Sequence, residues 1–291
     1  MALTAAVTLN IHAAEQAVGV RPETALRLME LAADESTTAK QLEEVIDADL
    51  SMTVRTLKLA NSAFFGMPTR VSRIDRAITM LGVANIAKLA ASGSLESAFS
   101  HITIDAPGIT AETPWRYAVA VALATEIITR QCPATSSVGT RRLGAEAFVA
   151  GLIHDLGTLV QARLAPSPFG EAVRQSLRTG LPLVSMEQRL IGIDHAQIGL
   201  MLARHWQLPP TLANAIGYHH EPLAADPEHR SLACVIYIAA QLVRRGGIAS
   251  FDGDTDTPHL EHAMDHLHID PLRIDKIATA IQARVAATPG K

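Results

Sequence analysis

A histidine and an aspartate stand side by side in the string GLIHDLG, as His154 and Asp155. An imidazole nitrogen and a carboxylate oxygen are ligands for divalent metals, and metal-bound water is a common nucleophile in hydrolases. Three further histidines, His195, His219 and His220, each fall near the end of a predicted helix. Side chains at helix ends can converge from different helices on one point. These five residues could therefore form a metal site.

Each of these histidines also has a simpler interpretation. A single histidine in a protein interior is most often hydrogen-bonded and binds no ligand. The joint occurrence of five candidate ligands is more informative than any one of them, but spacing alone leaves both interpretations open. The sequence contains no GxGxxG, Walker A, HExxH or GxSxG string, so nucleotide-fold, zincin and α/β-hydrolase chemistry has no motif support.

A second group of polar side chains is a candidate surface for a ligand or partner: Asn61, Arg70, Arg73 and Arg76. The arginines are spaced by three and could bind a phosphate, a nucleic acid or an acidic partner. The simpler interpretation, which we favour, is a solvated basic face beside a helix end. Asn61 would satisfy that helix end, and Phe64 and Phe65 would pack against it.

Composition limits the class of protein. Hydrophobic residues make up 48% of the 291 residues and aromatic residues only 4%, which favours a core of packed helices. The net charge of -4 argues against a generally basic nucleic-acid binder. Cys132 and Cys234 form no CxxC pattern, which fits a reducing cytoplasm and excludes a cysteine-based zinc site. The sequence shows no signal peptide and no apolar run long enough for membrane insertion, so we expect a cytoplasmic protein.

Helical periodicity predicts an all-α chain without strands or internal repeats. Gly82 lies inside a periodic run and predicts a kink or a break there. Gly199, one turn after His195, would allow a neighbouring helix to approach closely. Asp194 and Gln197 predict a capping box before the helix that carries His195. The acidic, Gly-rich loop 246–258 is expected to be mobile. The helices that would position the candidate ligands are expected at about 115–130, 145–162, 195–206, 210–220 and 232–245.

Taken together, these strings resemble the HDOD family, the HD-related output domain of bacterial signalling. The resemblance rests on LKLANSAFFG in the N-terminal half, and on GLIHDLG, HAQIGLMLARHWQLP and YHH in the second half. It covers residues 20–222, divided into an N-terminal helical part, 20–105, and an HD-like part, 113–222. Residues 223–291 are expected to form a helical extension. The resemblance implies an all-helical fold related to metal-dependent HD phosphohydrolases and to HD-GYP cyclic di-GMP phosphodiesterases.

The resemblance also assigns the five candidate ligands to the family's metal positions, with His219 and His220 matching the pair used by two-metal relatives. Two further ligand positions carry other residues: Tyr117 matches an early histidine, and Gln241 matches a late aspartate. Thr158 stands where HD-GYP enzymes have a lysine. A phenol and an amide supply little charge to hold a cation. With Asp155 as the only obvious carboxylate, the site suits iron, zinc or nickel better than magnesium or calcium.

The expected function is a non-catalytic signalling module. It would bind a partner protein or a small ligand in the groove between its two parts, and components of the cyclic di-GMP pathway are candidate partners. The alternative is a residual metal-dependent phosphohydrolase that uses the five candidate ligands. A third hypothesis, nucleotide or nucleic-acid binding, would rest on the three arginines and would be weakened by salt.

Overall fold

The computed structural model describes residues 10–20, 22–61, 70–99, 102, 104–131, 140–253 and 258–286. Within these residues all the regular secondary structure is helical and no strand is present, so the predicted all-α class is confirmed. The helices are α1 (Ile11–Val18), α2 (Glu23–Ala33), α3 (Ala39–Asp47), α4 (Leu50–Ala60), α5 (Ile74–Leu81), α6 (Val83–Glu96), α7 (Thr113–Gln131), α8 (Thr140–Ile153), α9 (Leu156–Leu164), α10 (Pro166–Thr179), α11 (Leu183–Leu190), α12 (His195–His205), α13 (Pro210–Gly217), α14 (Arg230–Arg245), α15 (Leu260–His266) and α16 (Pro271–Ala286), with 3₁₀ turns at Ser97–Phe99 and Pro222–Ala224.

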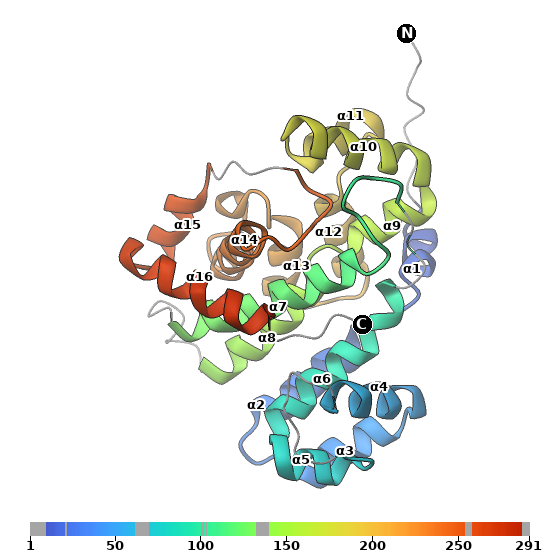
Figure 1. Cartoon of the computed structure of the whole chain (residues 1–291), viewed down its shortest axis with the longest axis vertical. Helices are drawn as coiled ribbons and strands as arrows, with labels where there is room; N and C mark the ends of the chain where they lie inside the picture. Colours follow the sequence, from blue (N-terminus) through green and yellow to red (C-terminus); the bar gives the residue numbers. More distant parts are fainter. Residues whose placement is uncertain are drawn as a thin grey trace.

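Helices α2 to α6 gather at one end of the molecule (Figure 1). Both α2 and α4 pack against α6, and α3 packs against α5. Gly82 separates α5 from α6 with a φ of 84°, a backbone conformation that favours glycine, so the predicted interruption is a complete break. The helix starts are set by local side chains: Thr38 forms a capping box with Gln41, and Asp49 caps α4.

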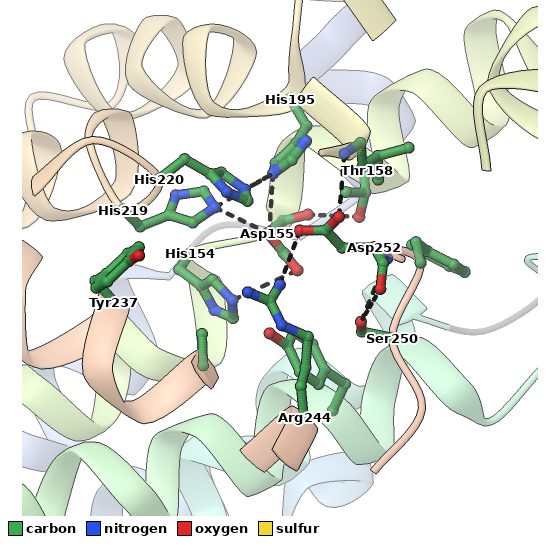
Figure 2. Close-up of a pocket in the computed structure, with 14 residues that line it drawn as sticks. His154, Asp155, Thr158, His195, His219, His220, Tyr237, Arg244, Ser250 and Asp252 are labelled. Atoms are coloured by element: carbon green, nitrogen blue, oxygen red, sulfur yellow. Dashed lines mark hydrogen bonds and ion pairs between the residues drawn. The ribbon is translucent and has the colours of Figure 1, made fainter. Parts of the chain in front are cut away.

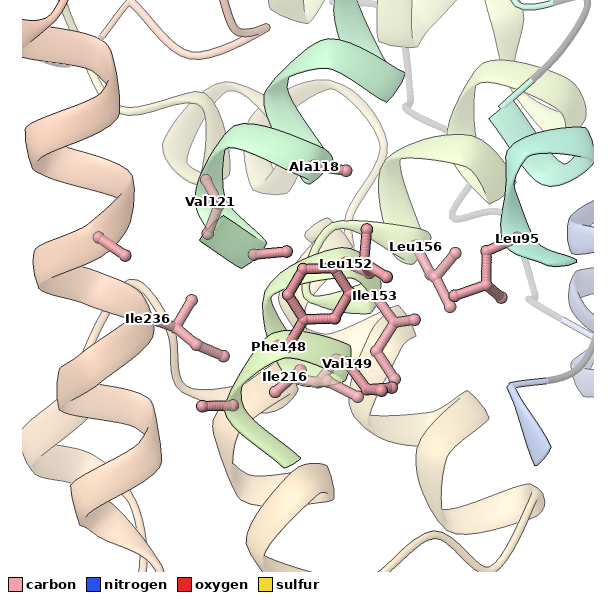
Figure 3. Close-up of a cluster of buried hydrophobic side chains, with 14 of the residues drawn as sticks. Leu95, Ala118, Val121, Phe148, Val149, Leu152, Ile153, Leu156, Ile216 and Ile236 are labelled. Carbon is pink, nitrogen blue, oxygen red and sulfur yellow. The ribbon is translucent and has the colours of Figure 1, made fainter. Parts of the chain in front are cut away.

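The other end of the molecule is built around the antiparallel neighbours α7 and α8, with α14 and α16 packed against α7. The segment after residue 222 therefore shares one core with the helices before it. Figure 3 shows part of this core, where side chains from α6, α7, α8, α9, α13 and α14 meet. Its labelled members are all buried: Leu95, Ala118, Val121, Phe148, Val149, Leu152, Ile153, Leu156, Ile216 and Ile236.

The sequence predicted one helix over 145–162, but the structure has two. Helix α8 ends at Ile153 and α9 begins at Leu156, so His154 and Asp155 form the turn between them. Asp155 precedes α9 with a φ of −98° and a ψ of 16°. The apolar periodicity continues through both helices, which is why the pattern did not reveal the break. The interruption turns the two side chains toward the interior at one junction.

Two glycines let the neighbouring helices reach this junction. A Cβ on Gly157 would lie 2.0 Å from the carbonyl oxygen of His195, so α9 can approach the start of α12 only with glycine there. A Cβ on Gly199 would lie 2.6 Å from Cγ2 of Ile216, which confirms the close helix approach that the sequence predicted at this position. Asp194 caps α12 by accepting from the backbone of Gln197 at 2.7 Å. Only this half of the predicted capping box is present in the described contacts, because the Gln197 side chain accepts from Gln188.

The loop after α14 was expected to be mobile, but its described part is anchored to α10 and α11. Asp252 Oδ1 accepts from the backbone of Leu183 at 3.0 Å. The backbone of Gly253 donates to Ser176 Oγ at 2.9 Å. These contacts fix residues 250–253 against the mouth of the junction between α8 and α9. Residues 254–257 of the loop lie outside the described residues.

Candidate metal centre

A small cavity lies at this junction and contains all five candidate ligands (Figure 2). Its volume is about 20 Å³. One water needs about 10–15 Å³ on this measure, so the cavity has room for one or two waters or for a metal ion. The lining residues are Tyr117, His154, Asp155, Thr158, Leu183, His195, His219, His220, Tyr237, Ala240, Arg244, Ser250, Phe251 and Asp252.

Three of the histidines are oriented by hydrogen bonds from their outer ring nitrogen. His154 Nδ1 donates to the carbonyl three residues earlier at 2.8 Å, and His219 Nδ1 does the same at 2.7 Å. His195 Nδ1 contacts Glu187 Oε2 at 2.7 Å, and the same oxygen accepts the backbone N–H of His195 at 2.9 Å. In each ring, Nε2 is left facing the cavity. A carbonyl or carboxylate behind each imidazole is the arrangement found around protein-bound metals.

The inward-facing nitrogens gather around one carboxylate. Asp155 Oδ1 lies 3.3 Å from Nε2 of both His195 and His219, and Asp155 Oδ2 lies 3.4 Å from Nε2 of His154. His220 Nε2 lies 2.9 Å from His195 Nε2. One ligand atom from each of Asp155, His195, His219 and His220 falls within 4.8 Å of all the others. Dashed lines in Figure 2 mark these contacts, which converge near Asp155.

Burial and charge set the protonation states in this cluster. Burial lowers the pKa of His154 to about 4, and it also lowers the pKa of His220 well below the ordinary value. Burial would raise the pKa of Asp155. The electrostatic attraction of His154 and the hydrogen bonds with His195 and His219 outweigh burial and hold this pKa well below its usual range. Burial opposes protonation of His195, yet Glu187 and Asp155 raise its pKa well above 6.5. A metal ion would therefore displace a proton from His195 on binding.

This donor set fits a borderline transition metal. Three or four imidazole nitrogens and one carboxylate oxygen are the ligand types that zinc, iron and nickel accept, whereas magnesium and calcium prefer several oxygens. Asp155, His195, His219 and His220 would hold the ion, and His154 lies beside them. The structure places all five candidate ligands in one cavity, at distances that no spacing rule could give, and their metal-binding role stays a prediction.

Sequence reasoning missed two charged residues that line the cavity. Arg244, in the last turn of α14, donates from Nη1 to Asp252 Oδ2 at 2.8 Å. The two side chains are only 11% and 7% exposed. Figure 2 shows the guanidinium directed toward Asp155, between His154 and Asp252. Asp252 carried no usable signal because it lies in an acidic loop, and Arg244 resembled an ordinary basic residue at a helix end. Glu187, the buried partner of His195, lacked a motif as well.

Tyr117 and Gln241 occupy the two family ligand positions that carry other residues in this chain, and only one of them lines the cavity. Tyr117 lines the cavity with its ring 5.8 Å from that of His154, and burial raises its phenol pKa, which keeps it neutral. Gln241 is buried on α14 but does not line the cavity, so the position expected for it was wrong. The α14 face turned to the cavity carries Tyr237, Ala240 and Arg244, and Gln241 lies to one side of that face.

The second predicted group does not join this centre. The amide of Asn61 donates to the carbonyls of Leu57 and Val71 and accepts from the backbone of Val71, each at 2.7 Å. These bonds give it the structural role that the sequence favoured. The three arginines of the group are exposed, and Arg73 pairs with Asp75 at 2.7 Å. Phe64 and Phe65 lie outside the described residues.

The fold and this cluster together define the family. Residues 19–222 match the model of the HDOD domain, and the chain belongs to that family. No helix among the described residues is long and apolar enough to cross a membrane.

Three known proteins illustrate the relationship. A provisionally named signal transduction protein from Marinobacter aquaeolei VT8 superposes with a TM-score of 0.76 at 24% identity, covering 98% of this chain and 66% of that one. A provisionally named phosphohydrolase from Shewanella amazonensis SB2B superposes with a TM-score of 0.64 at 25% identity, covering 96% and 98%. An uncharacterized protein from Treponema pallidum (strain Nichols) is 25% identical over 242 residues, which are 80% of this chain. The chain spans 43% of that relative's length.

Proposed function

We propose that the chain is a non-catalytic signalling module. In this proposal the candidate metal centre, called the HD-like centre from here on, holds a single transition-metal ion that stabilises the structure. The observation that carries this proposal is the pair formed by Arg244 and Asp252 at the edge of the ligand cluster. A fixed guanidinium beside the metal ligands opposes a second cation by charge repulsion. It also pairs with Asp252, the one carboxylate besides Asp155 among the described residues that line the cavity.

The size of the cavity supports the same proposal. Hydrolysis of a phosphodiester requires the metal, an attacking water and the phosphate to lie together, with reacting atoms about 3–3.5 Å apart. The cavity holds about 20 Å³, which is far less than a nucleotide substrate fills. Ser250 and Asp252 line the cavity on the side of the loop, where Ser250 Oγ donates to the carbonyl of Asp252 at 3.1 Å and accepts from its backbone N–H at 3.3 Å. The cavity therefore has no room for such a substrate.

A bound ion would have a mechanical role instead. Asp155 lies before α9, His195 opens α12, and His219 and His220 follow α13. One ion shared by these ligands would fix three helix ends to a single point. The output would then pass to a partner through the surface of the module, and we propose a signalling protein of the cyclic di-GMP pathway in the cytoplasm. Support for a signalling role comes from the family resemblance.

The retained ligands favour one alternative, a residual metal-dependent phosphohydrolase. The test is turnover of cyclic di-GMP and of bis(p-nitrophenyl) phosphate by the purified chain loaded with Mn²⁺, Fe²⁺ or Zn²⁺, beside the variant His154→Ala. We expect equal, background-level rates in the two proteins. Metal-dependent turnover that His154→Ala abolishes would overturn the proposal and establish the alternative.

A further inference from the structure

A second cluster of metal-ligand side chains lies away from the HD-like centre, where helix α1 meets the end of α12. His12 and Glu15 are three residues apart on α1 and therefore share one face of that helix. His205 is the last residue of α12. One ligand atom from each of the three falls within 4.8 Å of the other two. We propose that these residues bind a divalent transition metal such as zinc, independently of the HD-like centre.

The potential ligand atoms of the cluster lie close to one another. His205 Nε2 lies 3.4 Å from Glu15 Oε2, and the rings of His12 and His205 meet edge to face with centroids 5.4 Å apart. Trp206 Nε1 donates to the other carboxylate oxygen, Glu15 Oε1, at 3.0 Å. The bond from Trp206 therefore orients the Glu15 carboxylate through Oε1, while Oε2 is the oxygen that lies near His205. A hydrogen bond to the outer atom of a ligand group is the usual support around a bound metal.

The chemistry of the three groups selects the class of ion. Two imidazoles and one carboxylate form a three-ligand set that zinc accepts, with water in the remaining position. A set with a single oxygen ligand is poor for magnesium or calcium. The side chains of Glu15 and His205 are 20% and 29% exposed and His12 is exposed, so an ion can reach the cluster from solvent.

A metal here would tie the N-terminal helix to the HD-like part. The end of α1 near Val18 is already held, because the Arg163 guanidinium of α9 donates to the carbonyls of Ala17 and Val18. The proposed ion would fix the beginning of α1 to the end of α12. Helix α12 begins at His195, a candidate ligand of the HD-like centre, and it spans about 15 Å. The two ions would therefore bind at opposite ends of one helix.

The test is zinc binding by the full chain, measured by chelator competition and by hydrogen exchange of the α1 amides. We expect His12→Gln and His205→Gln each to lose one equivalent of zinc and the zinc-dependent protection of α1. Glu15→Gln keeps an acceptor for Trp206, and we expect it to weaken the same site at least 10-fold. The exposed residue His262 supplies the matched control His262→Gln, which is expected to bind zinc as the wild type does.

The variant Asp155→Asn separates this site from the HD-like centre. In this variant we expect the zinc-dependent protection of α1 to persist, because Asp155 supplies no ligand to the proposed site on α1 and α12. Equal zinc stoichiometry and equal α1 protection in wild type, His12→Gln and His205→Gln would overturn the proposal. Neither result depends on whether the HD-like centre is catalytic.

Discussion

Arg244 Nη1 lies 2.8 Å from Asp252 Oδ2, in the same cavity as the carboxylate of Asp155. The arginine comes from the last turn of α14 and the aspartate from the loop that follows it. Two carboxylates and several imidazoles would otherwise form a set able to hold more than one cation. Because the arginine already brings one positive charge to the cavity, we expect the centre to bind only one ion from solution.

Removal of this arginine is expected to destabilise the fold. Arg244→Met leaves Asp252 as a buried charge without its cation, which costs about 3 kcal/mol of unfolding free energy. Urea unfolding in the presence of chelator measures the loss. The exposed Arg189 gives the control Arg189→Met, for which we expect a change within about 0.5 kcal/mol. In the double variant Arg244→Met/Asp252→Asn most of the loss should be recovered. Equal stability of Arg244→Met and Arg189→Met would contradict the importance of the pair.

Glu187 is expected to control metal affinity through His195. Its Oε2 accepts two N–H groups of that histidine and so fixes the ring with Nε2 toward Asp155. Glu187→Gln removes the charge behind the ring and should weaken zinc binding at the HD-like centre by about 10- to 100-fold. Competition with a chromophoric chelator gives the affinity, and Glu261→Gln on the exposed face of α15 is the control. An unchanged affinity in Glu187→Gln would show that the ring needs no such support.

The shifted pKa values of the buried histidines predict how the unfolding free energy of the metal-free chain depends on pH. Burial lowers the pKa of His154 from 6.5 to about 4, so below pH 6.5 the unfolded chain binds a proton that the folded chain excludes. Stability should therefore decrease as pH falls from 6.5 toward 4, by at most about 3 kcal/mol for this group. The lowered pKa of His220 acts in the same direction, whereas the raised pKa of His195 opposes it.

Urea unfolding of chelator-treated protein between pH 7.5 and 4.5 measures this dependence. Replacement of the imidazole in His154→Asn should flatten the decrease, because the variant has no group at this position to protonate. A decrease of the same size in wild type and variant would assign the acid sensitivity to other groups.

A pair of glycine substitutions tests the helix approach that builds the centre. Gly157→Ala forces a Cβ to within 2.0 Å of the His195 carbonyl oxygen, and we expect a loss of about 3 kcal/mol because the backbone must shift. Gly170 lies inside α10, where a Cβ would meet only the end of Arg174 at 3.5 Å. Gly170→Ala should therefore be neutral or stabilise the chain by up to about 1 kcal/mol. Similar effects of the two substitutions on the thermal midpoint would contradict the close packing of α9 against the start of α12.

Much of the fold could be predicted from local patterns. The all-α class, the break at Gly82 and the close approach at Gly199 follow from periodicity and from the properties of glycine, and the structure agrees with each. The split of 145–162 into α8 and α9 could not be predicted in this way. Both helices are apolar on the sides that face the core, so the period continues across the turn at His154 and Asp155.

The residues of the candidate site also fall into those that could be predicted from the sequence and those that could not. The five candidate ligands could be named because their types and their places at helix ends point to metal chemistry. Arg244, Asp252 and Glu187 could not, because their importance comes from tertiary contacts with residues 8 positions away or more. The expected role of Gln241 failed for a related reason, since a shift of one position on a helix turns a side chain by about 100°. Whether a residue of α14 faces the cavity is decided by packing against α7 and α13.

The most direct test of a single-ion centre closed by Arg244 is anomalous diffraction from a crystal of the wild-type chain soaked with zinc. We expect one metal peak at the centre, bound by Asp155, His195, His219 and His220, with Arg244 still paired to Asp252. Two metal peaks about 3.5–4 Å apart, the spacing of two-metal hydrolases, with the Arg244 side chain displaced, would contradict it.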